Sequence, residues 1–92
     1  MGEIDKQLYI DRLTDNLPML RAKIGLTQKN LADILGVSSY TVLAIEKKQR
    51  KMTWNMFLSI LLVCLSNKDV KKILCTLDIY SEELIDYIEG KR

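Results

Sequence analysis

The sequence predicts an all-α protein built from five to six short helices. With four glycines and one proline in 92 residues, it has too few turn residues for a many-stranded sandwich or barrel. Apolar residues recur at the three- and four-residue spacing of amphipathic helices. Capping residues and glycine stops divide this pattern into short segments. We expect a single domain over residues 1–92, because a chain of this length has room for one core.

The first helical pattern covers residues 4–21. Gly25 ends it, in the left-handed conformation that favours glycine. Asp15 or Asn16 could cap a helix that carries Pro18 in its first turn. The segment is therefore either one kinked helix or two short ones.

Each later segment begins with a Ser, Thr or Asn, whose side chain can accept hydrogen bonds from the free N–H groups of a first helical turn. The caps and segments are Thr27 for 28–35, which Gly36 ends, Ser38 for a helix at about 39–47, Thr53 for 54–65, Ser66 or Asn67 for a helix through 77, and Ser81 for the last. The two segments 28–35 and 39–47, joined at Gly36, predict a two-helix corner at about 28–47.

The segment 54–65 is apolar almost all round and must be covered on several sides. The predicted core stripe is Trp54, Phe57, Leu58, Leu61, Leu62 and Leu65, and the surplus is Met56, Ile60 and Val63. Either the terminal helices or a second copy of the chain would cover the surplus. We favour the second copy, which gives a homodimer.

Positive charge is concentrated in the middle of the chain. The formal net charge is +2, but residues 14–52 carry seven basic and three acidic groups, and the segments on either side are each slightly acidic. The densest run is Lys47, Lys48, Arg50 and Lys51. It is either a solvated surface or a phosphate-facing patch, and a neighbouring motif must decide between them.

Several other functions are not indicated. The chain has no histidine, so it has no His-containing zinc site, and its two cysteines lack a metal-binding spacing. Cys64 and Cys75 lie in apolar helical stretches, where we expect both side chains to be buried and the protein to occupy a reducing compartment. The longest apolar run, residues 60–65, is far below the ~18–20 residues of a membrane span, and the polar first residues do not form a signal peptide. We expect a cytoplasmic protein with no catalytic activity and no cofactor.

Residues 28–46 form a pattern that is typical of a tight helical corner. Ala32 allows the second helix to cross closely, Gly36 supplies a positive φ, and Ser38 caps the second helix. With Val42 and Ile45 inward, we expect Ser39, Tyr40, Leu43, Ala44 and Lys47 to point outward. An exposed helix at such a corner suits a DNA major groove. The alternative is an ordinary helical hairpin in a bundle that does not bind DNA.

The pattern resembles the lambda-repressor and Cro family (the XRE family) of helix-turn-helix domains, which is common in bacteria and their phages. The matching words are Leu17-Pro-Met-Leu-Arg21, Gly25-Leu-Thr-Gln28, Leu31-Ala32, Leu35-Gly36-Val37-Ser38, and Val42 with Ile45-Glu46. The likeness covers residues 17–65, with an N-terminal extension at 1–16 and C-terminal helices at 66–92. It implies a lambda-repressor-like bundle whose recognition helix runs over about 39–47.

The resemblance also implies roles for individual residues. Gln28 matches a glutamine that touches phosphate and braces the recognition helix, and Arg21 and Glu46 match a buried ion pair. Ser39, Tyr40 and Ala44 match base-facing positions, Leu43 shares their surface, and Lys47, Lys48, Arg50 and Lys51 match a loop beside the DNA backbone. The DNA-contact set also includes Ser38 and Thr41, at the start of the helix. Tyr40 could instead be a surface aromatic residue, and Lys48 and Arg50 could be merely solvated.

Two departures from the family pattern concern the loop and the bases. Lys48 stands where the family often has glycine, and Met52 where it often has proline. The base-facing set lacks Arg, Gln and Asn, so base readout is expected to be sparse and to depend partly on DNA shape. We expect a sequence-specific transcriptional regulator that binds double-stranded DNA. The alternative is a protein-interaction module, such as an antitoxin whose acidic segment 78–89 binds a protein partner.

Overall fold

The computed structural model describes residues 3–90, so four terminal residues of the expected domain, 1–2 and 91–92, lie outside the described residues. Within residues 3–90 the protein is all-helical and has no strand. The helices are α1 (Lys6–Ile24), α2 (Gln28–Leu35), α3 (Ser39–Glu46), α4 (Trp54–Leu65), α5 (Lys68–Thr76) and α6 (Glu82–Ile88). The predicted all-α class is therefore confirmed.

The helix ends lie where the capping residues place them. Thr27, Ser38, Thr53, Asn67 and Ser81 each accept a hydrogen bond from a backbone N–H of the following first turn. Of the two candidate caps for α5, the chain uses Asn67. These boundaries confirm the predicted segments to within one or two residues.

The first segment is one helix and not two. α1 runs without interruption from Lys6 to Ile24 and includes Pro18. Asp5 caps its start, and Gly25 ends it with φ of +87°. Asp15 and Asn16 therefore lie inside the helix and cap nothing.

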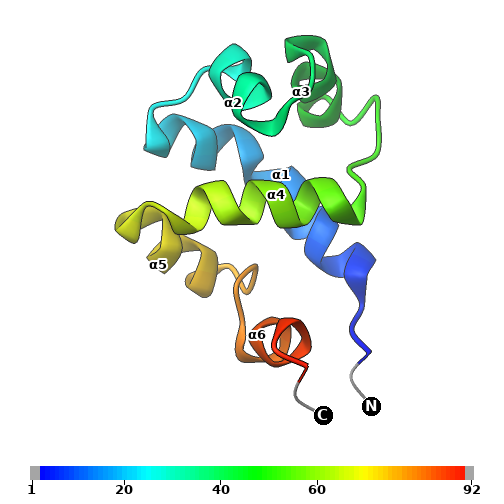
Figure 1. The fold of residues 1–92 in the computed structure, drawn as a ribbon, viewed down its shortest axis with the longest axis vertical. Helices are drawn as coiled ribbons and strands as arrows, with labels where there is room; N and C mark the ends of the chain where they lie inside the picture. The colour runs from blue at the N-terminus through cyan, green and yellow to red at the C-terminus, as the bar shows by residue number, and fades with distance from the viewer. Residues whose placement is uncertain (1–2, 91–92) are drawn as a thin grey trace.

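The helices are arranged around α1 and α4, which cross at the centre of the molecule (Figure 1). In this view α2 and α3 lie above the crossing, and α5 and α6 lie below it. The largest fully buried side chains include Tyr9, Leu13 and Leu20 of α1, Phe57 of α4 and Leu74 of α5. A single core cluster connects all six helices.

The C-terminal helices are attached to the first half of α1. The hydroxyl of Tyr9 donates to Glu83 Oε1 at 2.7 Å and lies 2.6 Å from Ser81 Oγ. Arg12 donates to the carbonyl oxygen of Asp78 at 2.8 Å. Leu84 is fully buried. The acidic segment 78–89 therefore packs against the body of the protein.

The buried face of α4 differs from the predicted stripe. Phe57, Ile60, Leu61 and Cys64 are buried, whereas Leu62 is 72% exposed. The prediction that Leu62 belongs to the core is therefore wrong, and Ile60 takes a core position instead. A helix that is apolar all round has no polar side to orient it, so periodicity alone placed the stripe too far round the helix.

The two cysteines have different environments. Cys64 is buried, and burial raises the pKa of its thiol to about 11. Cys75 is exposed, so the prediction that both are buried is wrong for Cys75. The residues of α5 that face the core are Val70 and Leu74, and Cys75 lies away from that buried face. Within residues 3–90, no helix is long and apolar enough to cross a membrane.

Candidate nucleic-acid interface

α2 and α3 form a tight corner. Thr27 and Asn30 form a capping box at the start of α2. Gly36 ends α2 with φ of +76°, a conformation that costs glycine little. The N–H of Val37 donates to the carbonyl oxygen of Ala32 at 3.0 Å, which closes the turn. Ser38 then starts α3 two residues after the glycine.

The start of α3 faces solvent. Ser39 and Tyr40 are exposed, and Tyr40 keeps 66% of its surface accessible. Thr41 and Leu43 are half-buried. The hydroxyls of Ser38 and Thr41 lie 3.1 Å apart and share a hydrogen bond. The first turn of α3 thus presents a surface with hydroxyl groups and an aromatic ring.

Ala44 does not belong to this surface. It is only 3% exposed, so the prediction that it faces outward is wrong. The N–H groups of Gln49 and Arg50 both donate to the carbonyl oxygen of Ala44, at 2.9 and 3.3 Å. These two bonds close the turn that follows α3.

An ion pair inside the protein supports the end of α3. Arg21 of α1 donates to both carboxylate oxygens of Glu46, through Nε at 2.9 Å and Nη2 at 3.2 Å. The side chains are 19% and 6% exposed, respectively. Gln28 of α2 donates to Glu46 Oε1 at 2.8 Å, and Arg21 also donates to the carbonyl oxygen of Leu26. Glu46 therefore links the first three helices.

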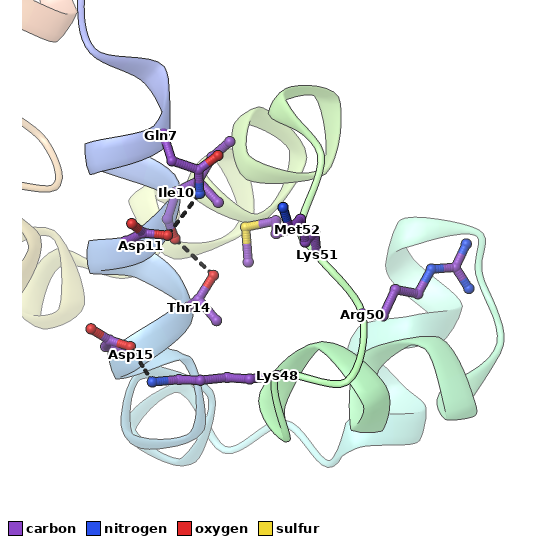
Figure 2. Close-up of a pocket in the computed structure, with 9 residues that line it drawn as sticks. All are labelled: Gln7, Ile10, Asp11, Thr14, Asp15, Lys48, Arg50, Lys51 and Met52. Carbon is purple, nitrogen blue, oxygen red and sulfur yellow. Dashed lines mark hydrogen bonds and ion pairs between the residues drawn. The ribbon is translucent and has the colours of Figure 1, made fainter.

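The basic segment after α3 is exposed, but its cations point in different directions. Lys47, Lys48, Arg50 and Lys51 are all exposed. Lys48 reaches α1, where its Nζ lies 2.7 Å from Asp15 Oδ1. In Figure 2 the Arg50 side chain points away from α1. Only part of the predicted phosphate-facing patch is therefore free of a carboxylate partner within the described chain.

A cleft of about 380 Å³ separates α1 from this basic segment. It is lined by Gln7, Ile10, Asp11, Thr14, Asp15, Lys48, Arg50, Lys51 and Met52 (Figure 2). Gln7 donates to Asp11 at 2.7 Å, and Thr14 donates to the carbonyl oxygen of Ile10. The polar groups on the α1 wall are therefore hydrogen-bonded within the chain.

The sequence indicated Asp15 only as a possible helix cap and did not indicate its pairing with Lys48. Asp15 lies 33 positions before Lys48, and local spacing cannot reveal contacts at that separation. The one signal in the sequence was Lys48 itself, which stands where the lambda-repressor and Cro family often has glycine. Within residues 3–90, no group of three His, Cys, Asp or Glu side chains is placed to hold a metal ion.

Comparison with protein families, curated proteins and solved structures found no match to this chain.

Proposed function

We propose that this chain is a sequence-specific DNA-binding transcriptional regulator with a lambda-repressor-like fold, in which α2 and α3 form the helix-turn-helix and α3 enters the major groove. The observation that carries the proposal is the combination of an exposed start of α3 with a braced end. Ser39 and Tyr40 face solvent, while Glu46 is held by Arg21 and Gln28. A recognition helix needs this rigidity, because its side chains must meet base edges in a fixed register.

The proposed contacts fall into two classes. Tyr40 and Ser39 supply polar groups for base edges, and Leu43 supplies an apolar contact for a thymine methyl group. Gln28, Ser38, Thr41 and the N–H groups at the start of α3 suit phosphate, as do Lys47 and Arg50. With Ala44 buried, direct base readout rests on fewer residues than the sequence predicted.

The proposed location of the protein is the cytoplasm, and its proposed partner is double-stranded DNA bound by a homodimer. Two-fold symmetric binding would place one recognition helix in each half-site. The exposed Leu62 is the apolar residue of α4 that a substitution test of dimerisation should address first.

An antitoxin-like interaction module stays an alternative prediction. In that function the acidic segment 78–89 would bind a protein partner. That segment is packed through Leu84 and the Tyr9–Glu83 hydrogen bond, so a partner would meet a folded surface.

We expect the cations beside α3 to set the salt dependence of DNA binding. Replacing Lys47 or Arg50 by glutamine should make the negative slope of log K against log salt concentration shallower by about one unit for each replacement. The reason is that each contact between a cation and a phosphate releases about one counterion from the DNA. Fluorescence anisotropy with a short mixed-sequence duplex measures this slope. Lys72→Gln is the matched control, since Lys72 is an exposed lysine of α5, a helix that lies on the other side of α4 from α3 (Figure 1). Equal slopes for Arg50→Gln and Lys72→Gln would argue against a DNA surface at α3.

A further inference from the structure

The backbone at Lys48 has an unusual conformation for a lysine. Its φ is +61°, in the left-handed region that glycine adopts more easily. The N–H of Lys48 donates to the carbonyl oxygen of Ile45, and those of Gln49 and Arg50 donate to that of Ala44. Lys48 is therefore the residue just after the end of α3 at which the chain reverses. Glycine would satisfy this backbone at lower cost. The lysine side chain must therefore be explained by what it contacts.

The Lys48 side chain crosses the cleft and contacts α1. Its Nζ lies 2.7 Å from Asp15 Oδ1, and Figure 2 shows the ammonium group directed at that helix. The hydrogen bond and charge of Asp15, with a smaller contribution from Asp11, raise the pKa of Lys48 above its ordinary value. Asp11 is one turn away on α1 and accepts from Gln7. Lys48 is thus paired with Asp15 and is attracted more weakly by Asp11.

This environment is unfavourable for a phosphate. A DNA phosphate at Lys48 would have to displace Asp15 or lie beside it, and Asp11 would add a second repulsive charge. Arg50 lies two residues further on, and its side chain points away from α1 (Figure 2). Lys47 is exposed and has no carboxylate partner among residues 3–90. These two cations are in a better position to meet a DNA backbone than Lys48 is.

We propose that Asp15 is a positioning residue for the DNA-facing segment: it binds Lys48 across the cleft and fixes residues 47–51, so that Lys47 and Arg50 meet phosphate and Lys48 does not. The inference rests on the proposed function and assigns a role to α1 in it. An exposed ion pair contributes little to global stability. The effect is therefore local, and it is measured at the segment itself.

A charge swap tests the positioning role. Asp15→Lys combined with Lys48→Asp keeps the net charge and the combined length of the pair, and aspartate tolerates positive φ better than most residues. Lys48→Gln alone should speed hydrogen exchange at the amides of Gln49 and Arg50 by about twofold to fivefold, the range expected of an exposed pair. The swapped protein should exchange more slowly at these amides than Lys48→Asp alone, which has the same residue at the left-handed position but no partner, whereas a purely steric role of Lys48 would give equal rates in the two variants. Unchanged exchange in Lys48→Gln would overturn the proposal.

The salt slope on the mixed-sequence duplex separates Lys48 from a phosphate ligand. Lys48→Gly keeps the chain reversal and removes an ammonium group that, on this proposal, contacts no phosphate. Because the slope counts phosphate contacts, it should equal that of the unmutated protein, while the affinity itself falls because the segment is less firmly held. A slope reduced by about one unit, as for Arg50→Gln, would show that Lys48 contacts phosphate and would overturn the inference. Failure of the unmutated protein to bind any duplex would contradict the proposed function. The exchange rates of the swapped protein would then still decide whether Asp15 holds the segment.

Discussion

Replacing Arg21 by methionine is expected to lower the free energy of unfolding by about 3–5 kcal/mol. The Glu46 side chain is only 6% exposed beside Arg21, and the variant leaves it with Gln28 as its remaining side-chain donor. A buried charge without its partner is far more costly than the ion pair is stabilising. Methionine keeps most of the apolar volume of arginine, so the loss reports the charge and its hydrogen bonds. Urea denaturation followed by circular dichroism measures the change.

The control for Arg21 is a surface ion pair in the same molecule. Lys29 lies 3.5 Å from Asp33 on α2, and both side chains are well exposed. Lys29→Met should change stability by less than about 1 kcal/mol. Adding Glu46→Leu to the Arg21 variant should restore much of the lost stability, because the uncompensated charge is removed. Comparable losses for Arg21→Met and Lys29→Met would refute the account of Glu46 as the link between the first three helices.

Replacing Tyr40 by alanine is expected to weaken binding to a specific duplex by about 1–3 kcal/mol, or roughly fivefold to 150-fold. Binding to a mixed-sequence duplex should change much less, since phosphate attraction supplies most of it. Tyr40 is 66% exposed, so its removal leaves the core intact. Fluorescence anisotropy on both duplexes gives the ratio of the two affinities.

Lys47→Gln is the comparison for Tyr40, because Lys47 is proposed to contact phosphate alone. It should weaken binding to both duplexes by similar factors. If Tyr40→Ala behaves in the same way, the tyrosine reads no base and serves only as a surface contact. In that event the sequence preference of the protein would have to come from Ser39, Leu43 and DNA shape.

The helix boundaries were predictable because each depends on a short stretch of chain. A Thr, Ser or Asn in the cap position and a glycine with positive φ act within one turn of the residue concerned. The pairing of Arg21 with Glu46 came from a resemblance, and the structure places these two side chains in contact. Neither composition nor spacing connects residues 25 positions apart.

The remaining differences arise from tertiary contacts. Ala44 is buried although the helical pattern of α3 predicts that it faces outward, so the packing of other parts of the chain decides its exposure. Leu62 is exposed because α4 is apolar on every side and only its neighbours select the buried face. Asp15 meets Lys48 because α1 is one long helix that extends past the cleft. Each of these features requires the relative placement of two or more helices.

Selection of bound duplexes from a random DNA library is the most direct test of the proposal that α3 reads a DNA sequence. The experiment should be run at about 0.15 M salt, so that phosphate attraction alone is not mistaken for recognition. The account predicts enrichment of a pseudo-palindrome, with half-sites about one helical turn apart or a multiple of it, as two copies of α3 would require. No enriched sequence from a folded protein would contradict sequence-specific DNA binding and favour an interaction module.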